Sequence, residues 1–353
     1  MTRATSPIRI GVVGCGSIGY WTHLRELRSL RGARLVAASD PDPAARERAG
    51  RLTGLQVEES SEALLSRSDV DAVVIAAPTG LHASLAIAAA HAGKHIYLEK
   101  PIATTLPDAE RVVAAVTAAG IVAAVGFNRR CHPAFEQARA LLESGRLGPV
   151  RAVQMVFTEP AASVGGPTWK RSRTLGGGVL LDLASHHVDL LRWALGAEVS
   201  GVSAGVDTRR CEADTAWLRL SLDEGVHALG YYSSAAGRAD SLTFICERGV
   251  LAADRFRPGV TLQVSRRFGY GVRRAVAFPT VAGLAWRSRR WWRPSWESSY
   301  RRALARFVTM CRGGGRGLAT MHDGYEALRV IVAAERSAID DRPHRVPNGT
   351  SPP

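Results

Sequence analysis

The chain has 353 residues, 46% of them hydrophobic and 22% charged, which is enough for two globular domains with substantial cores. Its 46 Lys and Arg residues outnumber the 32 Asp and Glu residues, so the formal net charge is +14. No apolar stretch reaches the about 18 residues that a membrane-spanning helix needs, and Met1 to Pro7 lack the apolar core of a signal peptide. The five cysteines are scattered and never spaced CxxC, which argues against a disulfide framework or a structural zinc site and for a reducing cytoplasm.

Much of the positive charge is concentrated between Arg255 and Arg302, a stretch with twelve arginines and one acidic residue, Glu297. Such a stretch could attract nucleic acid, an anionic lipid surface or an acidic substrate. Its interleaved tryptophans would also suit stacking on bases. An arginine-rich solvated surface explains the same composition. We rank nucleic-acid binding below an anionic sugar-like substrate or a subunit contact.

The first motif follows an apolar run at residues 8–13, which predicts a buried strand. The strand turns into Gly14-Cys15-Gly16-Ser17-Ile18-Gly19, and a helical pattern follows over residues 17–30. This GxGxxG order supplies a tight turn, a close approach for a pyrophosphate and close packing of helix on strand. Asp40, 21 residues after Gly19, ends the next apolar run and can bind the hydroxyls of an adenosine ribose. The motif predicts a nicotinamide dinucleotide site and favours NAD over NADP.

Residues 1–126 are predicted to form this dinucleotide-binding domain of the Rossmann type. Strands at 35–38, 71–77, 94–98 and 121–125 alternate with helices at 43–52, 61–66, 81–92 and 106–119. Such alternation predicts a parallel sheet whose ligands bind beyond the carboxyl ends of the strands. The candidate cofactor-binding residues at these ends are Gly14, Gly16, Ser17, Ile18, Gly19, Asp40, Pro78, Thr79, His82, Glu99 and Lys100.

The pattern changes after Phe127, and we assign residues 127–342 to a second α+β domain for substrate binding and oligomerisation, with residues 343–353 as a tail. Helices are predicted at 133–144, 179–195, 296–311 and 324–339. A strand is predicted at 150–157, and period-two runs at 215–222, 226–232, 241–246 and 260–264 predict a mostly antiparallel sheet with one face covered by helices.

The helix predicted after Gly176-Gly177-Gly178 carries a second polar constellation. Asp182, His186 and Asp189 are spaced i, i+4 and i+7, so they share one stripe of an otherwise apolar helix. An imidazole with neighbouring carboxylates suits the removal of a proton from an alcohol. His187 points elsewhere and is interpreted as structural, and the glycines would allow a ligand to approach the backbone closely.

Together these motifs resemble the Gfo/Idh/MocA family, which includes glucose–fructose oxidoreductase and inositol dehydrogenase. The resemblance is carried by the GxGxxG turn, by Ala77-Pro78-Thr79-Gly80-Leu81-His82, by Glu99-Lys100-Pro101, by Gly126-Phe127-Asn128-Arg129-Arg130 and by the triple glycine with its Asp and His residues. It covers most of the chain. Ala184, where relatives usually have glycine, and Cys131, where an aromatic residue often follows the arginines, depart from the pattern. The arginine-rich stretch matches poorly, which leaves the substrate open.

The resemblance implies an NAD(P)-dependent oxidoreductase that acts on a secondary alcohol or ketone of a sugar, cyclitol or nucleotide-linked sugar. It implies Lys100, Asp182 and His186 as catalytic residues, without settling which is the base. Trp169 and Lys170 join these three as candidate substrate contacts. His82 is expected to bond locally at the start of its helix, and Arg129 and Arg130 to be structural. Self-association is expected because the second sheet would expose one face.

Two alternatives remain within this fold. An NAD-dependent glycosidase would oxidise a sugar transiently, eliminate the aglycone and reduce the ring again. A non-catalytic NAD-binding regulator is the other, although it would have no need of Lys100, Asp182 and His186.

Overall fold

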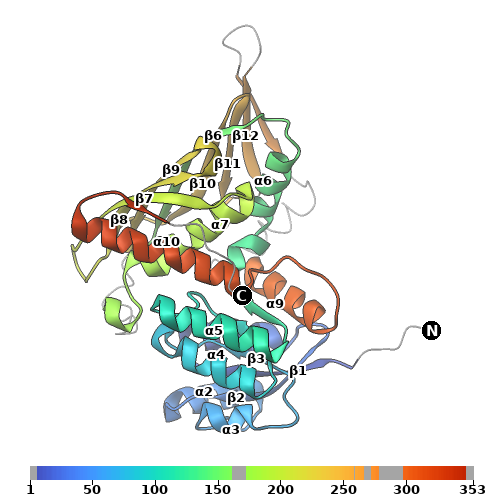
Figure 1. Cartoon of the computed structure of the whole chain (residues 1–353). Helices are drawn as coiled ribbons and strands as arrows, with labels where there is room; N and C mark the ends of the chain where they lie inside the picture. Colours follow the sequence, from blue (N-terminus) through green and yellow to red (C-terminus); the bar gives the residue numbers. More distant parts are fainter. Residues whose placement is uncertain (1–5, 161–171, 258, 266–271, 278–296, 347–353) are drawn as a thin grey trace. The chain divides into compact units, whose positions relative to one another are not determined.

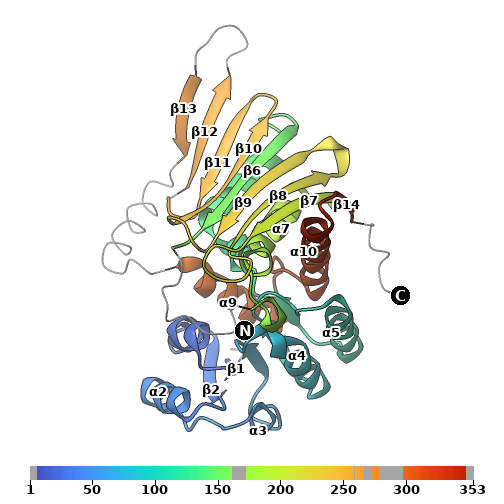
Figure 2. The ribbon, with the colours of Figure 1, turned by 90° about the vertical axis from the view of Figure 1, so that its left-hand side faces the viewer.

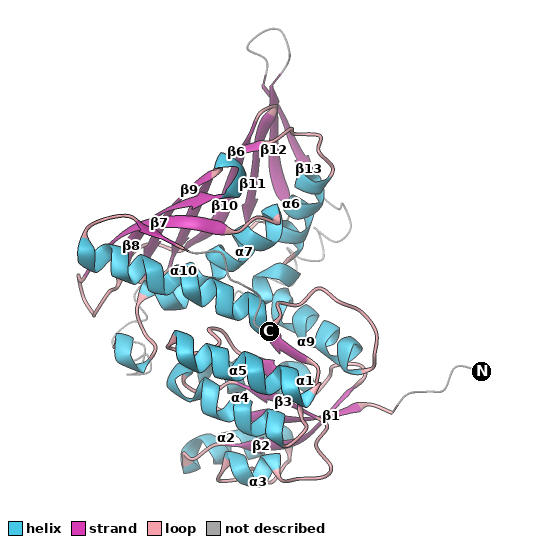
Figure 3. Cartoon of the chain, viewed as in Figure 1, coloured by secondary structure: helices cyan, strands magenta, loops and turns pink. Residues whose placement is uncertain are grey.

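The computed structural model of the chain describes residues 6–160, 172–257, 259–265, 272–277 and 297–346. The chain divides into two compact units. Unit 1 comprises Met1–Asn128 and Ser298–Tyr325, and unit 2 comprises Arg129–Glu297 and Glu326–Pro353. Figure 3 separates their helices from their strands, and the strands belong to two different sheets.

Unit 1 contains a parallel sheet whose described strands follow the order β2-β1-β3-β4-β5. The strands are β1 (Ile8–Val13), β2 (Ala33–Ser39), β3 (Ala72–Ile75), β4 (His95–Leu98) and β5 (Ala123–Val125). Most of their residues are apolar, and their carboxyl-terminal halves are buried, as expected for a sheet covered on both faces. The chain passes from β1 to β2 on one side and then crosses to β3 on the other, so a topological switch point lies at the carboxyl end of β1.

Helices connect these strands, and local sequence signals define their ends. They are α1 (Arg25–Leu27), α2 (Pro43–Thr53), α3 (Ser61–Leu65), α4 (His82–His91) and α5 (Leu106–Ala119). The side chains of Asp42, Ser60 and Thr105 accept hydrogen bonds from the first turns of α2, α3 and α5. Gly120 ends α5 in the left-handed conformation. Helices α4 and α5 pack side by side (Figure 1).

The helix that follows the glycine-rich turn is not regular. Residues 17–27 are helical, but Gly19–Leu24 within them form a π-helical turn ahead of α1. The hydrogen bonds of a π turn span five residues instead of the four of an α-helix, so the turn shifts the direction of the side chains that follow. The sequence pattern predicted the helix and gave no sign of the π turn.

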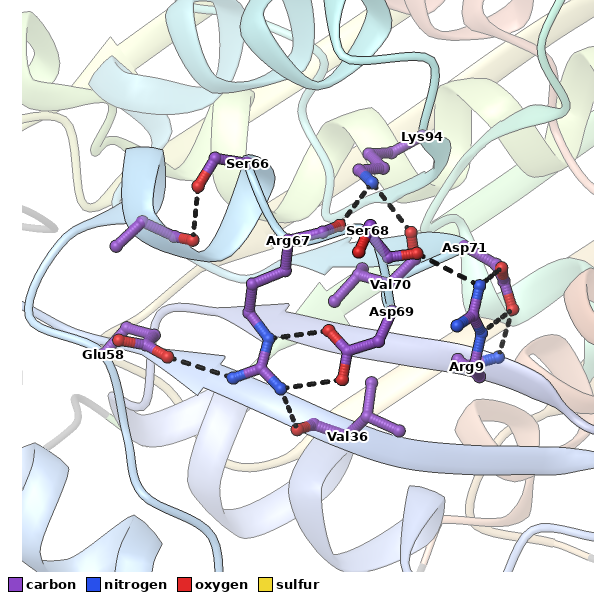
Figure 4. Close-up of polar contacts among 11 residues, drawn as sticks. Arg9, Val36, Glu58, Ser66, Arg67, Ser68, Asp69, Val70, Asp71 and Lys94 are labelled. Carbon is purple, nitrogen blue, oxygen red and sulfur yellow. Dashed lines mark hydrogen bonds and ion pairs between the residues drawn. The ribbon is translucent and has the colours of Figure 1, made fainter.

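Ion pairs and hydrogen bonds join the strands of unit 1 to the loops between them (Figure 4). Arg9, near the start of β1, pairs with Asp71 just before β3 at 2.6 Å. Arg67 pairs with Glu58 at 3.0 Å, and the Lys94 ammonium donates to the carbonyl oxygens of residues 67 and 70. Arg9, Asp71 and Lys94 lie at the amino ends of their strands, whereas Glu58 is bridged to Ser39 at the carboxyl end of β2. Because these side chains bind one another or backbone carbonyl oxygens, we interpret them as structural.

Residues 298–325 also belong to unit 1, although the sequence pattern groups them with the second domain. In α9 (Ser298–Cys311) the ring of Phe307 packs edge-on against Tyr97 of β4, with 5.7 Å between centroids. The backbone N–H of Val125 donates to the carbonyl of Ala319 at 2.9 Å. Tertiary packing of this kind is not encoded in the local period of the helix.

Unit 2 contains a mixed sheet with the described strand order β13-β12-β11-β10-β6-β9-β8-β7-β14, seen broadside in Figure 2. Its strands are β6 (Val150–Thr158), β7 (Val199–Asp207), β8 (Thr215–Leu222), β9 (His227–Ser233), β10 (Ala239–Cys246), β11 (Gly249–Asp254), β12 (Val260–Ser265), β13 (Val272–Ala277) and β14 (His344–Arg345). All pairs of neighbours are antiparallel except β6 and β9, which run parallel.

One face of this sheet is buried against helices of the same unit, which are α6 (Pro133–Glu143), α7 (Ser185–Leu195) and the later part of α10 (Met321–Asp340). Along β8, Ala216, Leu218 and Leu220 are buried, whereas Trp217 on the opposite face is exposed. These two sheets confirm the predicted fold class, a Rossmann-type domain followed by an α+β domain. None of the described helices is long and apolar enough to cross a membrane.

Candidate active site

The glycine-rich turn of unit 1 has the geometry that a dinucleotide phosphate requires. Gly14 has φ +95°, and a Cβ there would lie 2.7 Å from the backbone of Ala76. A Cβ on Gly19 would lie 2.0 Å from the carbonyl oxygen of Gly14, so helix and strand pack too closely for a side chain. At Gly16 no described atom lies within 4 Å of the corresponding position. Gly16 and Ser17 are exposed at the helix start, where free N–H groups can bind phosphate.

Asp40 follows the carboxyl end of β2 and is held by two backbone donors. The N–H of Cys15 donates to Asp40 Oδ2 at 2.7 Å, and the N–H of Asp42 donates to Oδ1 at 2.9 Å. A carboxylate oxygen can accept more than one hydrogen bond, so both oxygens can still accept from ribose hydroxyls. The residues of this turn therefore fit the adenosine and pyrophosphate portions of NAD.

Beyond β3, the segment from Pro78 to His82 lies at the next strand end. Pro78 is exposed, whereas the side chains of Thr79 and His82 are 2% and 1% exposed. The His82 ring lies between two carbonyl oxygens, with Nδ1 2.6 Å from that of Pro101 and Nε2 3.0 Å from that of Ala77. Burial lowers the pKa of His82 and thus favours the neutral ring. Both ring nitrogens face the backbone, which agrees with the expectation of local bonding, and the assignment of His82 to cofactor binding stays a prediction.

Glu99 and Lys100 follow β4 and lie in different surroundings. Glu99 is 6% exposed, and its Oε1 is 2.7 Å from Nε2 of the buried His23. Lys100 is half-buried and precedes a cis peptide bond to Pro101. The Glu99 side chain is thus directed into unit 1, while Lys100 is the residue of this motif that retains exposure at the strand end.

In unit 2, Asp182 and His186 lie one helical turn apart. Gly176 and Gly178 have φ +98° and +87°, and a π-helical turn, Leu180–Ala184, then leads into α7. Asp182 is half-buried, and His186 is 4% exposed. The ring of Phe157, on β6, lies 6.0 Å from that of His186. A carboxylate and an imidazole on one helix face can orient a hydroxyl group and accept its proton.

The neighbouring polar residues of α7 are structural. Asp189 is fully buried and accepts two hydrogen bonds from Arg130, at 2.9 and 2.6 Å. The structure therefore separates Asp189 from the stripe predicted with Asp182 and His186, because its carboxylate is occupied by a guanidinium. His187 is fully buried with Nε2 3.1 Å from Asp240, in agreement with its predicted structural role.

A buried charge network in unit 2 was not predicted. Asp240 contacts Arg129 at 2.9 Å, His187 at 3.1 Å and Arg255 at 3.4 Å. Burial alone would raise the pKa of Asp240, but the charge of Arg129 together with the contacts of His187 and Arg255 holds it well below its ordinary value. The partners lie 15 to 111 residues away in the sequence, so no local pattern could have identified the network.

A second unpredicted anchor precedes the triple glycine. Arg173 forms an ion pair with Glu335 of α10, and its backbone N–H donates to Glu212 at 3.1 Å. Val179 N–H donates to the carbonyl of Ala213 at 2.9 Å. These contacts fix the loop that leads to Asp182.

Three expectations fall partly or wholly outside the described residues. Trp169 and Lys170 lie in 161–171, and most of the arginine-rich stretch lies in 258, 266–271 and 278–296. Across the described part of the chain, no group of three or more His, Cys, Asp or Glu residues is arranged to hold a metal ion.

Comparison with known proteins matches both units. The model of an oxidoreductase family with an NAD-binding Rossmann fold matches residues 8–127, and that of the GFO/IDH/MocA C-terminal domain matches residues 135–252. Inositol 2-dehydrogenase of Rhizobium meliloti is 30% identical over 347 residues, which cover 95% of this chain and 98% of that protein.

Solved structures of an oxidoreductase domain protein and a dehydrogenase also match nearly the whole chain. The oxidoreductase domain protein from Kribbella flavida has a TM-score of 0.85 at 26% identity and covers 98% of this chain and 100% of its own. The WlbA dehydrogenase from Bordetella pertussis, in complex with NADH and UDP-GlcNAcA, has a TM-score of 0.82 at 26% identity. The match covers 98% of this chain and 99% of that protein.

Proposed function

Because this chain belongs to the Gfo/Idh/MocA family of NAD-binding oxidoreductases, we propose that it oxidises a ring secondary alcohol of a cyclitol or sugar. It is an oxidoreductase of CH–OH groups, and its cofactor is NAD. The observation that supports the proposal most is the presence of Lys100 at a strand end of the dinucleotide domain together with the Asp182 and His186 pair on a helix of the second domain.

Oxidation of a secondary alcohol removes a hydride from carbon and a proton from oxygen. When bound, NAD⁺ supplies the hydride acceptor. We assign proton removal to His186 and orientation of the substrate or the imidazole to Asp182. The Lys100 ammonium hydrogen-bonds the substrate oxygen and stabilises the negative charge that develops there. In the reverse direction Lys100 polarises the ketone, and His186 returns the proton.

Asp40 supports NAD as the preferred dinucleotide. Its carboxylate can accept hydrogen bonds from both ribose hydroxyls, whereas a 2′-phosphate would bring a second negative charge to the same place. Gly14, Gly16, Ser17, Ile18 and Gly19 are assigned to the pyrophosphate, with Pro78 and Thr79 at the neighbouring strand end.

Cyclitols and sugars are proposed because the relatives named above act on or bind molecules of this class. Because the positive charge of the arginine-rich stretch would suit an anionic substrate, we propose an anionic or nucleotide-linked sugar as the second substrate class. The test is a panel of inositols, neutral sugars and nucleotide sugars, assayed by the absorbance of NADH. Turnover of at least one neutral cyclitol or sugar is expected. Turnover of none, with NADH binding intact, would contradict the proposal, and a preference for nucleotide sugars would correct the substrate class.

We further propose that the enzyme acts as a homo-oligomer through the uncovered face of its second sheet. Trp217 of β8 is 50% exposed and is paired in register with Tyr231 of β9, which is 43% exposed, and Leu229 on the same face is 57% exposed. An exposed aromatic and apolar patch on a sheet face is typical of a protein interface. Light scattering of the wild type and of Leu229→Lys tests this, since a monomeric wild type would contradict it.

The proposed location is the cytoplasm. All five cysteines are free thiols, including the buried Cys15, Cys131 and Cys246. Free thiols are typical of a reducing compartment, and NAD-dependent metabolism supports the same assignment. Quantification of the protein in cytosolic and envelope fractions would test it.

A further inference from the structure

Two buried histidines hold the neighbours of Lys100 on either side. His23 is fully buried in the π-helical turn, and its Nε2 lies 2.7 Å from the carboxylate of Glu99. His82 is 1% exposed at the start of α4, and its Nδ1 lies 2.6 Å from the carbonyl oxygen of Pro101. Lys100 is the single residue between these two anchored neighbours.

The surroundings of His23 define its role as a hydrogen-bond donor. Tyr97 and Tyr300 lie edge-on to the ring at 5.8 and 6.1 Å. No partner for Nδ1 is found among the described residues, so a proton on Nδ1 would be a buried donor without an acceptor. We therefore assign the proton to Nε2, from which it is donated to Glu99.

Glu99 is held through both its side chain and its backbone. A Cβ on Gly126 would lie 3.2 Å from the carboxyl group, and the Glu99 N–H donates to the Ile75 carbonyl at 2.9 Å. Glu99 is thus held in the interior, whereas Lys100, at the bend directly after it, is half-buried. Anchoring both neighbours of Lys100 restricts its backbone and therefore the directions open to its side chain.

The two histidines lie on the segments assigned to cofactor binding. His23 is four residues after Gly19, on the helix that begins at the phosphate site, and His82 is three residues after Thr79. Neither ring has to touch the dinucleotide to transmit an effect of its binding. We propose that His23 and His82 are positioning residues that clamp the two neighbours of Lys100 and link its orientation to the occupancy of the cofactor site. This inference rests on the proposed role of Lys100.

Matched variants separate the hydrogen bonds from packing. His23→Phe keeps a ring against the tyrosines but removes the donor to Glu99, whereas the amide of His23→Gln can place a donor near Nε2. A neutral His82 ring has one N–H, which we assign to Nδ1 because its contact with the Pro101 carbonyl oxygen, at 2.6 Å, is shorter than that of Nε2 with Ala77, at 3.0 Å. His82→Phe removes this donor, and the amide of His82→Asn can replace it. His95→Phe is the control, because His95 lies at the amino end of β4 and accepts a hydrogen bond from Val122 N–H.

The first measurement is hydrogen exchange of the amides in residues 99–103, with and without NADH. We expect the two Phe variants at 23 and 82 to exchange at least about tenfold faster there, whereas His23→Gln, His82→Asn and His95→Phe stay within about threefold of wild type. NADH is expected to slow this exchange in the wild type and in the donor-keeping variants, and much less in the donor-removing ones.

Kinetics supply the second measurement. The donor-removing variants are expected to lose about 10- to 100-fold in kcat, with KM for NAD within about threefold. Unchanged exchange in both donor-removing variants would overturn the proposal, as would equal acceleration in His95→Phe. If His23→Phe does not fold, His23→Asn, whose amide is too short to reach Glu99, replaces it with the same expectation. A wild type that turns over no polyol would contradict the proposed function, while the exchange data would still decide the clamp.

Discussion

The backbone N–H of Cys15 donates a 2.7 Å hydrogen bond to the carboxylate of Asp40. This bond joins the glycine-rich turn after β1 to the end of β2, so Asp40 orders the glycine-rich turn in addition to the ribose contact proposed for it. Side-chain oxygens that bind backbone donors in turns order those turns. A substitution at Asp40 is therefore expected to affect both portions of the dinucleotide site.

The first prediction concerns dinucleotide choice. Asp40→Ala removes the ribose acceptor, the bond to Cys15 and the negative charge that repels a 2′-phosphate. Because a hydrogen bond to a charged group contributes about 1.5–3 kcal/mol, KM for NAD should rise about tenfold or more. The ratio of kcat/KM for NAD to that for NADP should fall by at least about tenfold, as measured by initial rates with each cofactor.

Asp42→Ala is the matched control for this experiment. Asp42 caps α2 by accepting from the N–H of Ala44 at 3.0 Å, and it lies two residues from Asp40. Loss of the cap should lower stability by about 1 kcal/mol and leave the cofactor ratio unchanged. An Asp40→Ala enzyme with a wild-type ratio would show that the carboxylate does not select the ribose.

The second prediction compares two lysines near opposite ends of β4. Lys100→Met should lower kcat by about 10²- to 10⁴-fold, since a developing oxyanion loses its charged donor, while Kd for NADH changes by less than about threefold. Lys94→Met should instead lower the melting temperature without changing kcat, because Lys94 binds the carbonyl oxygens of residues 67 and 70 at 2.7 and 2.8 Å. Steady-state kinetics and thermal unfolding of both variants test this, and a Lys100→Met enzyme with wild-type kcat would remove Lys100 from the mechanism.

Local sequence patterns predicted most of the secondary structure. The glycine-rich turn, the helix α5 with its Pro107 and Gly120 signals, and the alternating strand β8 all carry their geometry within a few consecutive residues. The fold class, the family and the NAD cofactor follow from such patterns and are confirmed by the two sheets and by the relatives.

Contacts between distant residues could not be predicted in this way. His23 and Glu99 are 76 residues apart, and Arg130 and Asp189 are 59 apart. The helical spacing predicts that Asp189 shares one stripe with Asp182 and His186. It gives no information about the Arg130 guanidinium that binds the Asp189 carboxylate. The parallel pairing of β6 with β9 and the packing of α9 in unit 1 likewise depend on the tertiary arrangement.

The third prediction contrasts two carboxylates of one helical segment. Asp189→Asn leaves the buried Arg130 without its charged partner and should lower the free energy of unfolding by about 3–5 kcal/mol. Asp182→Asn alters a half-buried residue, so it should cost less than about 1 kcal/mol, while kcat falls by at least about tenfold. Urea unfolding and kinetics of the two variants test the contrast. Equal loss of stability would contradict the structural role assigned to Asp189.

The fourth prediction concerns acid stability. Burial alone would raise the pKa of Glu297, but the charges of Arg255, His132 and Arg129 hold it at about 2, below the ordinary 4.5. Between these pH values the unfolded chain binds a proton that the folded chain does not, so stability should fall as pH decreases from about 4.5 to about 2. For Glu297 alone the loss is on the order of 3 kcal/mol, and Asp240, whose pKa is also lowered, adds to it.

Urea unfolding over a pH series measures this effect, with two glutamate variants for comparison. Glu297→Gln should be less stable at pH 7, because Arg255 loses its closest carboxylate, and should show a smaller decrease between pH 4.5 and 2. Glu247→Gln removes an exposed partner of Arg151 and should change stability by less than about 1 kcal/mol at every pH. A Glu297→Gln protein that keeps the full wild-type acid dependence would show that the proton is taken up elsewhere. Glu297 would then have no part in acid unfolding, since an uncharged amide at position 297 binds no proton in this range, and Asp240 would remain as the buried carboxylate of the network that is protonated.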